Sequence, residues 1–251
     1  MFNLKLSFIV ISLVAAIARP AAAVNLMVCV EDQLYIPYLD KDERKRADGN
    51  VVELLRWSAQ RIGFNVVLKR QSWGRCLSEI ADGKVDAAMA VNYTPARAKL
   101  MAFPQGAELS KPPAYLWRFH YPFFVEKGSV FSLEEYRQQG KYGISSPNHY
   151  VSYDTLKRQG LLAPYDYTLE SGLKMVALGR LDAYVVDSEI GQAALQRLKL
   201  ADKVEASKEF LLETYGHLAF SRHFYQDHKK QVDSLWQSLA LGRAQLFNLP
   251  K

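Results

Sequence analysis

The sequence predicts an α/β protein made of two lobes that are joined by two crossing segments. From residue 24 onward, short apolar runs of strand length alternate with stretches in which apolar residues recur every three or four positions. The order strand, helix, strand, helix, strand up to residue 91 predicts a parallel sheet covered by helices. A long aromatic segment at 114–125 suits a crossing between the lobes, and the α/β order then resumes over residues 141–200.

The first lobe is expected to hold residues 24–115 together with residues 216–251. Its apolar runs and periodic segments predict strands at 26–30, 64–69 and 85–91 and helices at 51–63 and 75–83. Gly63 and Gly83 end the two helical patterns, which is typical of helix C-termini. The tail from Phe224 is expected to be mostly helical.

The second lobe is expected to hold residues 116–215. Pro112 and Pro113 stand directly before the crossing segment, and Ser132 with Glu135 forms a capping box that opens a short helix. The further elements expected here are strands at 141–145, 165–170 and 182–187 and helices up to Leu156, at 171–181 and at 188–200. A returning strand at 215–221 is expected to lead back into the first lobe.

The N-terminal segment 1–23 has the order of a cleaved secretion signal. Lys5 supplies the positive start, residues 6–18 form an apolar run, and the alanines at 21–23 form a small-residue cleavage site. The run of 13 residues is too short to span a bilayer. Export through this signal would place the mature chain in the periplasm; a buried N-terminal helix is the alternative interpretation.

The charge balance does not favour a nucleic-acid partner. The chain has 32 Lys and Arg against 26 Asp and Glu, and the basic residues are scattered apart from the mixed run 41–46. Nucleic acid binding would need a clustered basic patch, so this run is expected to be a solvated loop. No cofactor and no metal site are expected.

Two cysteines, Cys29 and Cys76, are present. In an oxidising compartment an even pair predicts one disulfide. Cys29 belongs to the first expected strand and Cys76 to the helix after Trp73, and these elements should pack as neighbours in the first lobe. Free buried thiols are the alternative, because unpaired cysteines are often buried.

The stretch 82–104 carries a recognisable pattern of a short Gly-Lys turn, a Val-Asp-Ala strand, Thr-x-x-Arg-Ala and an aromatic residue. It is supplied by Gly83, Lys84, Val85, Asp86, Ala87, Thr94, Arg97, Ala98 and Phe103. This pattern resembles the bacterial extracellular solute-binding proteins of family 3, the polar amino-acid binding proteins of ABC importers. The resemblance implies the type II periplasmic-binding-protein fold with two hinge crossings. It also implies a monomer that closes on an amino acid and is recognised by an ABC permease in the inner membrane.

By this resemblance, Arg97 grips the α-carboxylate of the ligand. Its planar fork can donate two charge-assisted hydrogen bonds, which suits a carboxylate better than lysine does. The alternative is a surface arginine at a helix start, where its charge would oppose the helix dipole. Asn92 stands where the family usually has Ser or Thr, and Ala90 is placed with it among the ligand-binding residues.

The segment 179–187 resembles the family's second-lobe strand, which ends in an aspartate that accepts the ligand's α-ammonium group. This places Asp187 on the amine and leaves Asp182 structural. The alternative for Asp187 is an N-cap of the helix that starts at Ser188. Both roles are compatible, since ligands of α/β proteins bind at the C-terminal ends of strands.

The segment 30–38 resembles the family's acid-x-x-Tyr-x-Pro pattern. It implies that Tyr35 stacks on the ligand side chain and that Asp32 meets a distal positive charge, while Trp73 forms a second wall. Asp32 is equally expected as a plain turn residue, and core positions are the alternative for the two aromatic residues.

In the segment 145–150, Pro147, Asn148 and His149 replace small residues that bind carboxylates in the family. His149 is therefore expected to line the site as a polar residue and not as a catalyst. No catalytic residue is assigned. The alternative functions are a dehydratase-like periplasmic enzyme that acts on a small carboxylate, with His149, Asp32 and Glu31 as candidates, and a sensor module. The sequence does not name the ligand.

Overall fold

The computed structural model describes residues 23–33, 38–41 and 47–247. The expected signal segment, apart from Ala23, lies outside these residues, as do Tyr35 and nearly all of the basic run 41–46. In the described ranges, no helix is long and apolar enough to cross a membrane.

One sheet of eight strands runs through the molecule in the order β4-β1-β5-β10-β7-β9-β8, with β6 paired to β10. Its parallel part consists of β1 (Val24–Glu31), β4 (Phe64–Gln71) and β5 (Ala87–Asn92). β10 (Val204–Ser221) is antiparallel to β5, to β6 (Met101–Ala102) and to β7 (Trp117–Glu126). β9 (Ala183–Val185) and β8 (Ile144–Ser145) complete the sheet, and β2 (Asp40–Lys41) pairs separately with β3 (Ala47–Asp48).

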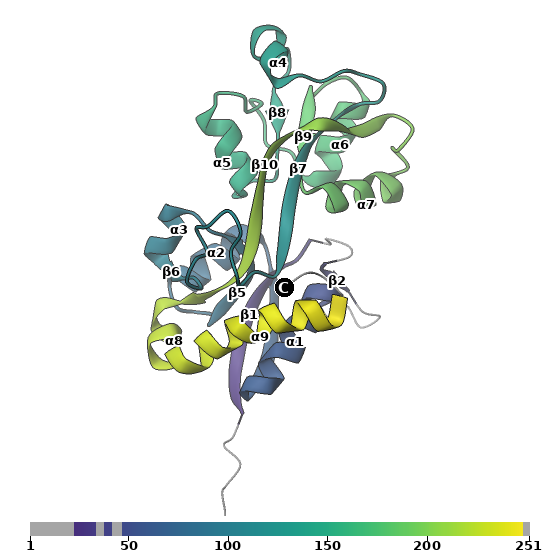
Figure 1. Cartoon of the computed structure of the whole chain (residues 1–251). Helices are drawn as coiled ribbons and strands as arrows, with labels where there is room; N and C mark the ends of the chain where they lie inside the picture. The colour runs from purple at the N-terminus through teal and green to yellow at the C-terminus, as the bar shows by residue number, and fades with distance from the viewer. Residues whose placement is uncertain (1–22, 34–37, 42–46, 248–251) are drawn as a thin grey trace, which may run out of the picture.

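The helices gather in two groups at opposite ends of this sheet (Figure 1). The lower group contains α1 (Asn50–Ile62), α2 (Trp73–Ala81), α3 (Pro95–Leu100), α8 (Arg222–Asp227) and α9 (Lys229–Phe247), which packs against α1. The upper group contains α4 (Leu133–Gln139), α5 (Val151–Arg158), α6 (Leu169–Ala177) and α7 (Ser188–Leu198).

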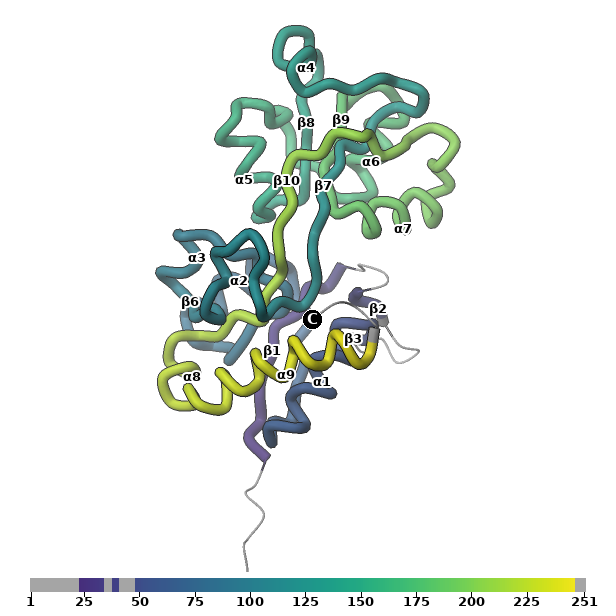
Figure 2. The backbone as a smooth tube through the Cα atoms, viewed as in Figure 1, coloured from purple at the N-terminus to yellow at the C-terminus, as the bar shows by residue number. Residues whose placement is uncertain are grey.

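The two long strands β7 and β10 pass from the lower group to the upper group side by side (Figure 2). At the lower end of this pair, the backbone N–H of Leu116 donates to the carbonyl of Gly216 at 2.7 Å. The lobe boundaries expected at 115/116 and 215/216 fall next to this bond, and the division into lobes at those positions stays a prediction.

Two expectations for the second lobe differ from the structure. The strand expected at 165–170 is wrong: residues 165–168 are irregular and α6 begins at Leu169. Thr168 caps that helix by accepting the N–H of Ser171, and the bridge to Ile144 of β8 is made by Leu162 instead. The returning strand begins at Val204 and not at residue 215, because it already pairs with β7 from Val204 to Gly216.

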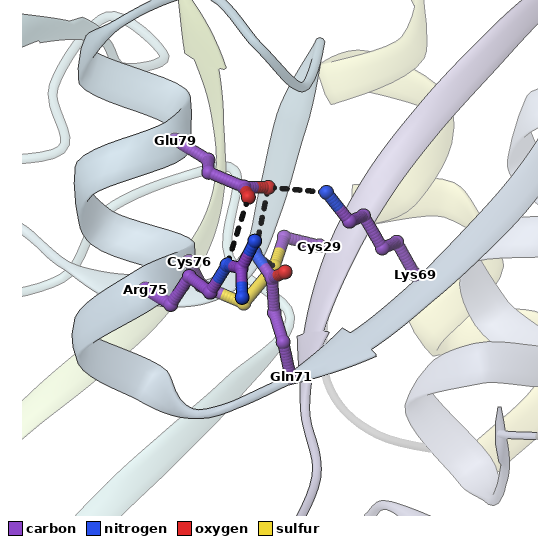
Figure 3. The surroundings of a disulfide bond; sticks show 6 residues. All are labelled: Cys29, Lys69, Gln71, Arg75, Cys76 and Glu79. Carbon is purple, nitrogen blue, oxygen red and sulfur yellow. Dashed lines mark hydrogen bonds and ion pairs between the residues drawn. A yellow bond between two sulfur atoms is a disulfide. The ribbon is translucent and has the colours of Figure 1, made fainter.

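The predicted disulfide between Cys29 and Cys76 is confirmed (Figure 3). It joins β1 to α2 inside a small apolar cluster. Beside it, the Glu79 carboxylate accepts hydrogen bonds from Lys69 at 2.6 Å, Gln71 at 2.8 Å and Arg75 at 3.0 Å. These donors, Lys69 first, lower the pKa of Glu79 to about 2. The disulfide fixes α2, whose first residue is Trp73, against β1, and the Glu79 carboxylate ties α2 to Lys69 and Gln71 of β4.

Candidate functional site

A pocket lined mainly by aromatic and aliphatic side chains lies where the lower and upper groups of elements meet. The space between its lining residues, including its open mouth, is about 460 Å³. The lining residues are Glu31, Leu39, Trp73, Met89, Ala90, Asn92, Trp117, Phe119, Tyr121, Tyr150 and Ile190.

The crossing strand β7 supplies one wall of this pocket. Successive side chains of a strand point to opposite faces, so Trp117, Phe119 and Tyr121 all face the pocket, with ring centroids 4.7 Å and 5.6 Å apart. On the opposite face, Arg118 and His120 both bind the carboxylate of Glu213 on β10. The sequence analysis missed this wall, although aromatic residues at alternate positions of the segment 114–125 were a signal for it.

Arg97 lies beside the pocket near the start of α3. Thr94 caps that helix by accepting the backbone N–H of Arg97 at 3.1 Å. The guanidinium donates to the carbonyl of Asn92 at 3.2 Å and, across to the upper group, to the carbonyl of His149 at 2.9 Å. Burial lowers the pKa of Arg97, because a charged group loses solvation there. Among the described residues, no carboxylate forms an ion pair with it.

His149 contacts the lower group of elements through its ring as well as its carbonyl. Its φ of 66° lies in the left-handed region, and its own N–H is bound by the side-chain oxygen of Asn148 at 2.8 Å. A Cβ added at Gly74 of α2 would lie 2.8 Å from Cδ2 of this ring. Gly74 thus allows the segment before α5 to pack directly on α2. The ring forms part of the contact between the two groups and is not among the residues that line the pocket.

Asp187 is buried, with 2% exposure, at the upper edge of the site. It caps α7: its Oδ1 accepts the backbone N–H groups of Glu189 at 3.2 Å and Ile190 at 3.4 Å, and its Oδ2 accepts that of His120 on β7 at 3.1 Å. Burial raises the pKa of Asp187 to about 6, and the three backbone donors partly offset that rise. The structure therefore shows the capping role, while the role on the ligand amine stays a prediction.

Tyr121 of β7 is buried, and charged groups of the site act on its hydroxyl. Burial raises the pKa of its hydroxyl well above the ordinary value; the charges of Asp187 and Glu31 add to this effect, and the charge of Arg97 opposes it. The phenol thus lies within electrostatic reach of two carboxyl groups and one guanidinium.

Of the remaining residues expected in the site, some line the pocket and one does not. Trp73, Ala90 and Asn92 line the pocket. Ala90 has a φ of 67°, a strained value for a residue with a Cβ. Asp32 is exposed and presents its backbone carbonyl to Arg70 at 2.9 Å.

The structure also adds residues that sequence reasoning did not assign to ligand binding. Tyr38 stacks on Trp117 with centroids 4.9 Å apart and planes 1° from parallel. Tyr150, the residue before α5, donates its hydroxyl to Oε2 of Glu31 at 2.5 Å and meets the Trp73 ring edge-on at 6.4 Å. In the sequence, the only signal for Tyr38 was its place in the aromatic segment 30–38, and the only signal for Tyr150 was its position directly before a helix.

Comparisons with known proteins agree with the expected resemblance. Residues 26–129 match the family model of the bacterial extracellular solute-binding proteins, family 3, so the resemblance stated from the sequence is confirmed. A search of curated proteins found no match.

Solved structures share the fold of the chain at low sequence identity. A histidine kinase sensor domain with similarity to periplasmic binding proteins is 21% identical with a TM-score of 0.70, covering 87% of this chain and 90% of its own. The arginine-bound form of ArgBP from T. maritima is 18% identical with a TM-score of 0.68, covering 86% and 96%. An ancestral amino acid-binding protein, a precursor of cyclohexadienyl dehydratase, is 18% identical with a TM-score of 0.67, covering 89% and 95%. The fold is that of type II periplasmic binding proteins.

Proposed function

We propose that this chain, which carries the family 3 sequence pattern over residues 26–129 on a type II periplasmic-binding-protein fold, captures an amino acid in the pocket beside Arg97. The observation that carries the proposal is the environment of the Arg97 guanidinium. It is half-buried, donates to two backbone carbonyls, and forms no ion pair with a described carboxylate. A partly buried cation of this kind is stabilised when a ligand supplies the anion.

The same guanidinium explains how capture would couple to lobe closure. Asn92 belongs to β5 in the lower group, whereas His149 precedes α5 in the upper group, so Arg97 bonds both sides at once. We propose a hinge motion about β7 and β10, with lobes at 24–115 plus 216–251 and at 116–215. Contacts that exist only in the closed arrangement would then shift the equilibrium toward it when ligand binds.

We further propose that the closed protein acts in the periplasm as a monomer and delivers its amino acid to an ABC permease, without chemical turnover. Trp73, Ala90 and Asn92 would contact the ligand, with His149 and Asp187 at its upper side and Asp32 and Tyr35 in the neighbouring segment. A stand-alone sensor role would use the same binding step, and it is supported by the likeness to a histidine kinase sensor domain.

The test is Arg97→Lys, measured by calorimetry after a thermal-shift screen of amino acids, polyamines and small organic acids has identified a ligand. Lysine keeps the charge but loses the two-pronged geometry. We expect affinity to fall by about 1.5–3 kcal/mol, the usual contribution of a charged hydrogen bond, which is about 10- to 150-fold.

The matched control is Arg61→Lys. Arg61 is exposed on α1 and stacks on Trp57, away from the pocket. This variant should bind the ligand as the wild type does. If Arg97→Lys also bound the ligand as tightly as the wild type, the guanidinium would take no part in binding, and the proposal would be wrong.

A further inference from the structure

The lining of the pocket combines several aromatic side chains with a negative charge. Among its described lining residues there are five aromatic side chains, one carboxylate and no Lys, Arg or His. The carboxylate is Glu31. The aromatic side chains are Trp73, Trp117, Phe119, Tyr121 and Tyr150. Ring faces attract cations through their quadrupole, and a carboxylate attracts them directly.

Glu31 is the last residue of β1, a central parallel strand of the sheet. Its side chain is half-buried and reaches across to the upper group, where Oε2 accepts the Tyr150 hydroxyl. An ionised carboxylate offers about four acceptor positions on its two oxygens, so it can accept several donors at once. The next residue, Asp32, is exposed and does not line the pocket.

Asp187 is differently placed. Both of its oxygens accept backbone N–H groups, and it is not among the residues that line the pocket. Among the described carboxylates, the one that a ligand cation inside the pocket would meet is therefore that of Glu31.

We propose that Glu31 is the specificity-determining acid of this site and that, with the surrounding aromatic rings, it selects solutes bearing an ammonium or guanidinium group on an apolar stem. This inference rests on the proposed function, because it concerns the same pocket. The substrate class is that of cationic amino acids and related amines. The hydroxyl of Tyr150 holds the carboxylate between the two lobes, so that cation recognition and lobe contact share one group.

The experiment compares L-arginine with L-citrulline, which has nearly the same shape but an uncharged end, by calorimetry. The wild type should bind L-arginine at least about tenfold more tightly, the effect of one charged hydrogen bond. In Glu31→Gln, which keeps an acceptor for Tyr150, the two affinities should become equal within about threefold. Glu53→Gln is the matched control, since Glu53 is an exposed acid on α1; it should keep the wild-type preference.

Tyr150→Phe separates charge from lobe contact. It keeps the ring and removes the hydroxyl that bonds Glu31, so it should weaken both ligands alike and leave their ratio unchanged. The proposal is overturned if Glu31→Gln keeps the preference for L-arginine. Loss of the preference in Asp32→Asn or Tyr150→Phe, with Glu31→Gln unchanged, would then assign the selectivity to that other residue.

Agmatine, which is L-arginine without its carboxylate, distinguishes this failure from failure of the proposed function. Glu31-dependent agmatine binding as tight as that of L-arginine and unaffected by Arg97→Lys would support the cation site and contradict the carboxylate clamp. Arg97-dependent binding of L-glutamine or L-glutamate, with neither L-arginine nor agmatine bound, would overturn the cation site and leave the amino-acid proposal standing.

Discussion

Replacing Asp187 by asparagine should remove a pH-dependent contribution to the stability of the folded protein. Burial raises the pKa of this carboxyl from 3.8 to about 6. Each pKa difference of one corresponds to about 1.4 kcal/mol, so the ionised group makes folding about 3 kcal/mol less favourable than the protonated group does. Asparagine has nearly the same shape, can still cap α7, and does not titrate.

The sign follows from where the proton binds. Because the folded-state pKa is the higher one, this group contributes stability below about pH 3.8 and loses that contribution as the pH rises through about 6. The wild type should therefore lose stability relative to Asp187→Asn over this interval. The difference in the free energy of unfolding between the two proteins should grow by about 3 kcal/mol, whatever its starting value.

Urea unfolding at several pH values between about 3.5 and 7.5, read by circular dichroism, measures this difference. Subtracting the two curves cancels groups that titrate equally in both proteins. A difference that stays constant across the interval would refute the reasoning, because it would mean that Asp187 keeps an ordinary pKa in the folded protein.

Two further predictions concern other buried groups. His217, whose Nδ1 lies 2.6 Å from the carbonyl of Ala114, has a pKa lowered by burial to about 4. As the pH falls from about 6.5 to about 4, the free energy of unfolding of the wild type should therefore fall by about 3 kcal/mol relative to that of His217→Gln. A difference between the two proteins that does not change with pH would contradict this. Replacing Cys29 and Cys76 by serine should lower the free energy of unfolding by about 4 kcal/mol, from the loop of 47 residues that the disulfide closes. An equally stable double variant would show that the crosslink contributes little.

The opposite slopes of Asp187 and His217 explain why variants are needed. As the pH falls from about 6 to about 4, protonation of Asp187 favours folding, whereas protonation of His217 opposes it. The two effects are similar in size, so the wild-type curve alone can be nearly flat. Only the difference curves assign each contribution to its residue.

The alternation of strands and helices was sufficient to predict the fold because each parallel strand and its helix are defined by local apolar periodicity. It failed at residues 165–170, where tyrosines at alternate positions look like a strand. There the cap at Thr168 starts a helix, and Leu162 already occupies the bridge to β8. The length of β10 was also missed, since none of residues 205–215 is buried and their apolar residues show no alternating pattern.

The raised pKa of Asp187 does not by itself favour an enzyme over a binding protein. Perturbed carboxyl groups are common at catalytic sites, but structural networks perturb pKa values as well. Here the cause is burial, and the three hydrogen bonds of the carboxylate are those of a helix cap that also ties α7 to β7. Incubation with prephenate-like acids separates the two functions, because turnover would require catalysis and a binding protein would give none.

The choice between Glu31 and Asp32 shows where sequence reasoning about the site reaches its limit. Within a strand, the two faces alternate residue by residue, so a motif that is offset by one position points to the wrong face. β1 ends at Glu31, and the alternation stops there, so the pattern along the strand cannot say which acid turns inward. The structure distinguishes the two acids through contacts that are remote in sequence. The Tyr150 hydroxyl donates to Glu31, whereas Arg70 donates to the backbone carbonyl of Asp32, which is exposed. The same reasoning locates the aromatic wall, because the inward face of β7 is fixed by the pairing of its outward residues with Glu213.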